Sequence, residues 1–186
     1  MILYRVFPYL ETAKPGEAGS PTYVHRPQGG GRLDNPSVYD AWYFGLTPEA
    51  AVGESFGDLA MWRDGMFRLP VLKGSRKVLG VYEVDDTIPV LDMDDAKVLL
   101  DRHLRPTQVV ARNYSVTQGW GLQIHHEGRW AGVRWWSYQR PHWTVYCLWV
   151  PVGDRCPARF VDYEELHLGH RSVVDAAHSL ERPIVR

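Results

Sequence analysis

Cysteine, net charge and long apolar runs are scarce in this sequence. The two cysteines among 186 residues, Cys147 and Cys156, allow neither a disulfide framework nor a zinc ribbon. A formal net charge of -1 argues against broad electrostatic binding of nucleic acid, which needs a basic face. We find no apolar run that could span a bilayer and no signal-peptide pattern at residues 1–5. We therefore expect a cytoplasmic protein that contacts neither membrane nor nucleic acid directly.

Common catalytic and metal-binding patterns are missing as well. The chain has no Gly-x-Ser-x-Gly elbow, no phosphate loop ending in Gly-Lys-Ser/Thr, and no Gly-x-Gly-x-x-Gly after a strand. His125 and His126 are adjacent, so they point to different sides of an element, and Gly169 weakens a helix that would align His167 with His170. Because no Cys/His set completes a tetrahedral spacing, we expect no metal.

Aromatic residues, by contrast, are abundant: the chain has eight tryptophans and ten tyrosines. Such residues fill cores, and they also line pockets for flat rings. The length fits one domain over residues 1–186, with no internal repeat or low-complexity segment.

A glycine-rich loop is the stretch around which the chain is organised. Residues 29–36 are Gly-Gly-Gly-Arg-Leu-Asp-Asn-Pro, and a short apolar strand follows them. Glycines let a backbone approach a ligand closely, because no Cβ intervenes. Arg32 adds a planar guanidinium that suits a phosphate or carboxylate. The loop therefore indicates an anion-binding site, although a plain flexible turn would have the same composition.

The helix after this strand carries the second candidate group. Thr47 is a good N-cap, and proline follows it at the first helical position. Val52, Phe56 and Leu59 recur at helical spacing and predict the buried face. Glu54 lies on roughly the opposite side, among small residues, where it could face a ligand or simply solvent.

Periodicity and turn signals along the rest of the chain predict an α+β fold. An irregular loop is expected over residues 11–31, and a strand ending before Pro8 is expected at residues 2–7. The other expected strands are residues 41–44, 77–84, 88–91, 132–137 and 143–150. The other expected helices are residues 94–100, much of 107–126, and 172–180.

Five motifs in their order and spacing resemble the RES domain family, which is named for arginine, glutamate and serine. They are Tyr4-Arg5, Gly30-Gly31-Arg32, Tyr43, the helix from Pro48 to Glu54, and Gly132-Val133-Arg134-Trp135-Trp136-Ser137. The resemblance covers residues 3–150. Leu33 stands where the family usually has tryptophan, and Tyr138 stands where arginine is common.

This resemblance implies a compact single domain with a mixed central sheet and flanking helices, related to ADP-ribosyltransferases. It implies an enzyme without cofactor that cleaves the nicotinamide–ribose bond of NAD, by phosphorolysis with inorganic phosphate or by hydrolysis. It further implies a toxin of a toxin–antitoxin pair, silenced by an Xre-like antitoxin that covers the active site. Transferred residue by residue, the catalytic groups would be Glu54, Arg32 and Ser137, and the substrate-binding groups would be Arg5 and Tyr43.

The chemistry of this bond suits those residue types. Cleavage builds positive charge on the ribose, which a carboxylate at Glu54 could stabilise. Arg5 and Arg32 could neutralise the pyrophosphate, Tyr43 could stack on nicotinamide or position it, and Ser137 could orient substrate or acceptor.

Two other functions fit the same residues: ADP-ribosyl transfer to a protein target, and nucleotide binding without catalysis. The acceptor and the oligomeric state, including a homo-oligomer, stay open. Trp135 and Trp136 alternate across a strand, so at most one of them can face a pocket.

Overall fold

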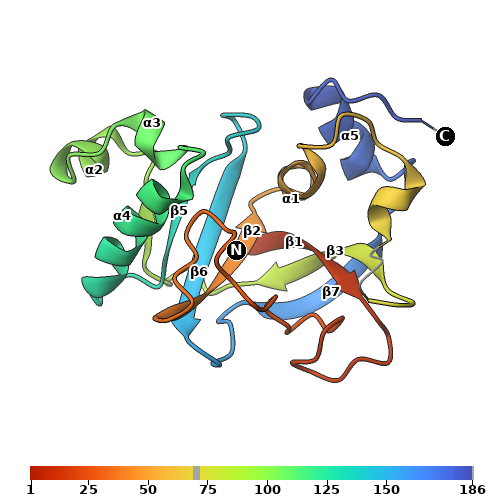
Figure 1. Ribbon diagram of the computed structural model, residues 1–186, viewed down its shortest axis with the longest axis horizontal. Coiled ribbons are helices and arrows are strands. Elements are labelled where there is room, and N and C mark those ends of the chain that lie inside the picture. The colour runs from red at the N-terminus through yellow and green to blue at the C-terminus, as the bar shows by residue number, and fades with distance from the viewer. Residues whose placement is uncertain (69–71, 186) are drawn as a thin grey trace.

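A computed structural model describes residues 1–68 and 72–185, and within them the chain forms one seven-stranded mixed sheet (Figure 1). The strands are β1 (Ile2–Tyr9), β2 (Tyr39–Gly45), β3 (Arg76–Glu83), β4 (Val90–Asp92), β5 (Gly132–Trp136), β6 (Thr144–Pro151) and β7 (Arg159–Glu165). Their order is β4-β5-β6-β2-β1-β3-β7. Only β4 and β5 pair in parallel; the other neighbours are antiparallel. The expected α+β class with a mixed central sheet is confirmed.

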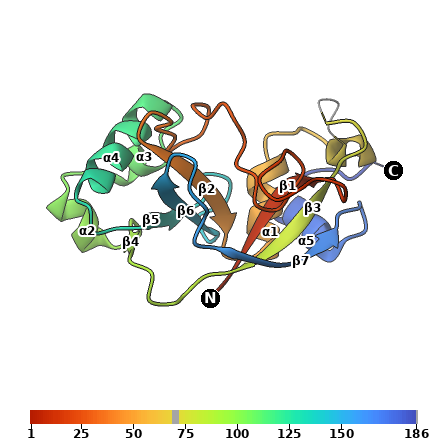
Figure 2. The same ribbon diagram turned by 90° about the horizontal axis from the view of Figure 1, so that it is seen from below.

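The helices gather in two groups at the two ends of this sheet (Figures 1 and 2). One group lies by β4–β6 and contains α2 (Ala96–Asp101), α3 (Pro106–Val109) and α4 (Tyr114–His126). The other lies by β1 and β3 and contains α1 (Pro48–Phe56) and α5 (Arg171–Ser179), with a short 3-10 helix, η1 (Asp64–Phe67), nearby. Each group has its own hydrophobic cluster.

Alternation along β2 shows how one strand serves two clusters. Tyr39 and Ala41 belong to the cluster under α2–α4, whereas Trp42 and Phe44 belong to a third cluster on the opposite face. Successive strand residues point to opposite faces, so this short apolar strand is buried on both sides.

The two ends of the sheet separate at its centre, where β1 meets β2. Only Tyr4 and Gly45 are partners between these strands, whereas β1 pairs with β3 along its full length. Figure 1 shows β1 and β2 diverging from this point. A cleft can therefore form between the two helical groups, with backbone from both strands in its wall.

Local sequence signals predicted most elements, with some differences in extent. The strand β1 continues through Pro8 to Tyr9. Proline removes an N–H donor, but β1 has no β2 partner beyond Tyr4, so the missing donor costs no ladder bond on that side. The expected apolar stripe of α1 is correct at Val52 and Phe56 and wrong at Leu59, which follows the helix and is exposed.

Differences in the second half are larger. The stretch expected to be largely helical over 107–126 divides into α3 and α4, and α4 starts at an Asn113 cap. The last helix, α5, starts at Arg171, one residue before the expected start, and His170 caps it. The strand β7 was not predicted, because its exposed and half-buried residues lack a clear apolar alternation.

Gly53 permits close contact between α1 and Trp143. A Cβ at Gly53 would lie 2.1 Å from Cζ3 of the Trp143 ring, which is itself buried. The residue next to Glu54 therefore has to be small.

We expect Gly53→Ala to destabilise the fold by about 1–3 kcal/mol, because overpacking outweighs the higher helix propensity of alanine. Urea unfolding measures the change. The matched control is Gly65→Ala in η1, where no atom lies within 4 Å of the added Cβ. A Gly53→Ala protein at least as stable as the parent would contradict this packing.

Candidate functional site

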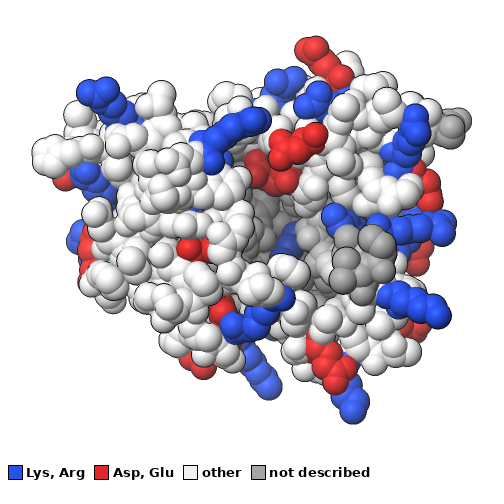
Figure 3. Space-filling model, viewed as in Figure 1, with Lys and Arg blue, Asp and Glu red and all other residues white. Residues whose placement is uncertain are grey.

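A cavity of about 260 Å³ lies where β1 and β2 separate. Figure 3 shows a hollow in the middle of this face, bordered by carboxylates. Its walls come from β1, the glycine-rich loop, β2, α1, α4 and β5, and they include Tyr4, Arg5, Gly31, Arg32, Tyr43, Glu54, Tyr114 and Trp135. Four of the five predicted site residues thus line one cavity.

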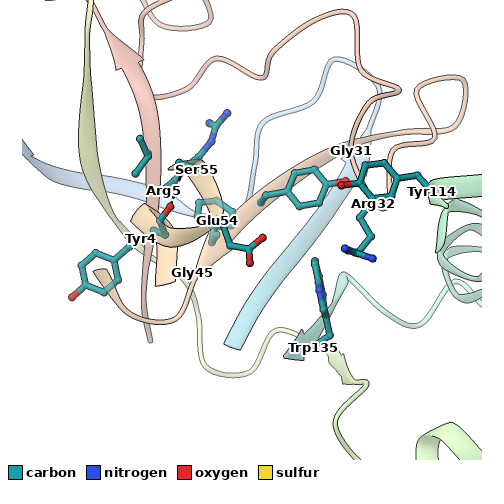
Figure 4. A pocket seen from close by; sticks show the side chains of 13 residues that line it. Tyr4, Arg5, Gly31, Arg32, Gly45, Glu54, Ser55, Tyr114 and Trp135 are labelled. Atoms are coloured by element: carbon teal, nitrogen blue, oxygen red, sulfur yellow. Dashed lines mark hydrogen bonds between the residues drawn. The ribbon is translucent and has the colours of Figure 1, made fainter. Parts of the chain in front are cut away.

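Glu54 projects from α1 into this cavity (Figure 4). Thr47 caps the helix by accepting a hydrogen bond from the Ala50 N–H at 3.3 Å, and the buried Val52 and Phe56 fix the opposite face. Although Glu54 is exposed to the cavity, protein atoms surround its carboxylate. This burial raises the pKa of Glu54, while the Ser137 hydrogen bond and the charge of Arg32 lower it.

Ser137, the fifth predicted residue, lies directly after β5 and holds this carboxylate. Its hydroxyl donates a hydrogen bond to Oε1 of Glu54, and its Oγ accepts from the Gln139 N–H at 2.9 Å and the Arg140 N–H at 3.3 Å. The residue is only 1% exposed. Ser137 is therefore placed to orient Glu54 rather than to contact a ligand itself.

Arg32 faces Glu54 across the cavity, and Figure 4 shows the two side chains pointing toward each other. Nη1 of Arg32 donates to the carbonyls of Val109 at 3.3 Å and Ala111 at 2.7 Å, and the guanidinium lies 5.3 Å from the Tyr114 ring centroid. These contacts bind the glycine-rich loop to the α3–α4 segment. A fixed cation and a fixed anion thus face each other across the space that a ligand would occupy.

Asp34 organises the glycine-rich loop, a role that was not predicted from the sequence. Its Oδ2 accepts the N–H groups of Gly29 and Gly31 at 2.8 and 2.7 Å, and its Oδ1 accepts the Tyr43 hydroxyl at 2.7 Å. A Cβ at Gly31 would lie 2.5 Å from Oδ1 of Asp34, so this position has no room for a side chain. Aspartate side chains commonly accept hydrogen bonds from nearby backbone N–H groups in loops, so an aspartate next to a glycine-rich run is a local signal that could have pointed to this role.

Tyr43 lines the cavity and also makes hydrogen bonds that hold the glycine-rich loop. Its ring lines the cavity, while its hydroxyl donates to Asp34 and accepts the Leu33 N–H at 2.8 Å. Burial raises the pKa of Tyr43 well above its ordinary value, so the hydroxyl stays protonated. In this structure the hydroxyl positions the loop that carries Arg32, and the ring remains available to a ligand.

Arg5 lines the same cavity from β1 but points away from Glu54 in Figure 4. Its guanidinium lies 4.7 Å from the Trp42 ring centroid, and its Nη1 donates to the Tyr23 carbonyl at 3.1 Å. The second arginine therefore lies on the side of the cavity that faces the long N-terminal loop.

Trp135 is the tryptophan of the β5 pair that faces the cavity, and Trp136 is not part of the wall. Tyr4 and Tyr114 also line it, although the Tyr4 ring points away from Glu54 in Figure 4. Tyr114 begins α4, and nothing in its local sequence distinguishes it from any other helix residue.

Two comparisons with known proteins bear on the family and the fold of this chain. The model of the RES domain family matches residues 2–169. The chain belongs to the RES domain family. Among solved structures, this RES protein is similar to a chain in the crystal structure of the M. tuberculosis MbcT–MbcA toxin–antitoxin complex. The TM-score is 0.58 at 15% identity, over 89% of this chain and 83% of that one, which supports the fold. No curated protein sequence matches significantly.

The described residues lack two features. Within residues 1–68 and 72–185, no group of three or more His, Cys, Asp or Glu side chains is arranged to hold a metal ion. Over the same residues, no helix has the length and apolar character needed to cross a membrane.

We expect Asp34→Asn to destabilise the RES domain by about 1–3 kcal/mol, because one amide cannot accept the two N–H donors and the Tyr43 hydroxyl together. Urea unfolding measures the loss. The exposed Asp154→Asn provides the control. Equal stability of the two variants would show that Asp34 does not hold the loop.

Proposed function

We propose that this RES protein consumes NAD by cleaving the bond between nicotinamide and ribose. The observation that carries the proposal is the placement of Glu54 and Arg32 on opposite walls of one cavity, with Ser137 holding the glutamate. Family membership supports the substrate class, because the RES resemblance implies NAD cleavage.

Glu54 would stabilise the reaction's developing charge. As the glycosidic bond breaks, positive charge builds on the ribose ring, and a fixed carboxylate beside it lowers the barrier most in a site with little water. Ser137 would keep the carboxylate in one orientation during this step. Since nicotinamide leaves as a neutral base, the site needs no strong general acid, and none of the wall residues is a histidine.

The two arginines would take the anionic part of the dinucleotide. Only Nη1 of Arg32 has hydrogen-bond partners among the described residues, so its other guanidinium donors can bind a phosphate oxygen. Tyr114 and the ring of Tyr43 would offer flat apolar surface for nicotinamide, and the buried Trp135 would close the wall beside them.

We propose water or inorganic phosphate as the acceptor of the ADP-ribosyl group, and each gives a distinct product. Hydrolysis releases ADP-ribose, whereas phosphorolysis releases ADP-ribose carrying a new phosphate at the former nicotinamide position. We further propose that the protein is the toxin of a toxin–antitoxin pair, with an Xre-like antitoxin as partner. Family membership and the fold likeness to the MbcT–MbcA complex support this role.

We expect the parent protein to release nicotinamide from NAD, and Glu54→Gln to lower the rate by about 10²–10³-fold. The substitution removes charge with little change of shape. Chromatography of nicotinamide and of the ribosyl product, with and without phosphate, measures the rate and identifies the acceptor. In cells, expression of the parent should arrest growth and deplete NAD, and Glu54→Gln should do neither.

Glu49→Gln is the matched control, because Glu49 lies on the same helix outside this cavity. It should retain the parent's rate. Burial raises the pKa of Glu54 in the folded protein above its value in the unfolded chain, so at neutral pH the charged carboxylate lowers the free energy of unfolding. The stability of Glu54→Gln should therefore equal or exceed that of the parent. Undiminished turnover in a folded Glu54→Gln protein would exclude Glu54 as the catalytic group.

The pH dependence of nicotinamide release shows whether Ser137 orients the Glu54 carboxylate or only supports the fold. Activity that needs the carboxylate should fall as pH drops through the raised pKa of Glu54. In Ser137→Ala this acid limb should move to higher pH, because the hydrogen bond that lowers the pKa is lost. Rates of nicotinamide release across pH measure the shift. Lower activity with an unmoved limb would mean that Ser137 only supports the fold.

A further inference from the structure

A second cavity of about 310 Å³ adjoins the site just described. Arg5, Gly31 and Tyr43 line both cavities, so the two share one wall. Beyond this wall the second cavity is bounded by His25, Pro27, Gln28, Gly30, Asp34 and Ala41, most of which belong to the long loop after β1. The reaction proposed for Glu54 uses none of the groups that are unique to this space.

The sizes of the two cavities indicate that they act together. Ligand pockets typically measure about 300–1,000 Å³. The cavity at Glu54 lies below that range and the second lies at its lower end. A dinucleotide consists of two nucleotides joined by a pyrophosphate, so two adjoining spaces of this size match its two halves better than either space does alone.

The charges around the shared wall indicate which part of a dinucleotide would lie in which cavity. Arg5 stands at the junction, half-buried against Trp42, and suits the anionic pyrophosphate. Further in, the wall carries the buried carboxylate of Asp34, which would repel a phosphate and tolerate a neutral nucleoside. His25 is exposed, and its ring can stack on a base.

The backbone of Gly30 leaves this space open. No atom lies within 4 Å of a Cβ built there, and the hydrogen bonds to Asp34 use the N–H groups of Gly29 and Gly31 but not that of Gly30. A ligand can therefore approach the main chain at Gly30 and accept its N–H.

We propose that the second cavity binds the adenosine half of the dinucleotide, with the pyrophosphate against Arg5 and the nicotinamide ribose beside Glu54. This inference rests on the proposed NAD-cleaving function and extends it to recognition of the second nucleotide. It assigns the loop segment from His25 to Gly30 the role of selecting an adenine dinucleotide over a mononucleotide.

Binding of AMP, measured by titration calorimetry on the full chain, tests the inference without depending on turnover. The parent should bind AMP saturably. Gly30→Leu, which adds a bulky side chain to the cavity wall at a position with open space, should weaken AMP binding by about tenfold or more. His25→Ala removes an exposed ring without removing any hydrogen bond that the structure describes, and it should weaken binding in the same direction.

The control is Gly65→Leu, which adds the same side chain at another open glycine outside both cavities. It should bind AMP like the parent. Absence of AMP binding to the parent, or unchanged binding in Gly30→Leu, would overturn the inference. Nicotinamide release from NAD is assayed separately on the same samples, so failure of the proposed reaction and failure of the adenosine subsite give different results.

Discussion

The hydrogen bond from Ser137 to Glu54 connects the two ends of this RES domain at its cavity, next to a bond from Gln139 to Asp58. Ser137 directly follows the strand β5, which packs with α4, whereas Glu54 belongs to α1, which packs with α5. Between these two ends the strands of the sheet pair only briefly, because Tyr4 and Gly45 are the single pair of partners between β1 and β2. The bond thus spans the place where the sheet separates, and it fixes a carboxylate that would otherwise lie free in the opening.

Burying the Glu54 carboxylate in the cavity wall costs stability, and hydrogen bonds and charges of neighbouring residues offset part of this cost. Burial raises the pKa of Glu54, which means that the charged carboxylate is held against its desolvation penalty. On the opposite wall, Asp34 accepts hydrogen bonds from two backbone N–H groups and the Tyr43 hydroxyl, and these three bonds hold the loop that carries Arg32. Preorganised charges of this kind need no rearrangement when a substrate arrives.

Features that depend on residues close together in the sequence could be predicted, whereas features that depend on distant residues could not. The cap at Thr47 and the start of α1 are local, and both were predictable. The types of the site residues followed from the family resemblance. The contact between Ser137 and Glu54, 83 positions apart, is tertiary, and no periodicity contains it. Asp34 has two local partners, Gly29 and Gly31, but its bond to the Tyr43 hydroxyl forms only when the loop folds onto β2. The strand β7 was missed because an edge strand with exposed residues lacks apolar alternation.

A crystal structure of the Glu54→Gln protein with bound NAD tests the central claim most directly. The account predicts the nicotinamide ribose beside the side chain at position 54, with the pyrophosphate against Arg5 or Arg32. NAD bound elsewhere, for example in the separate cavity near Glu164 and His170, with no contact to position 54, would contradict it.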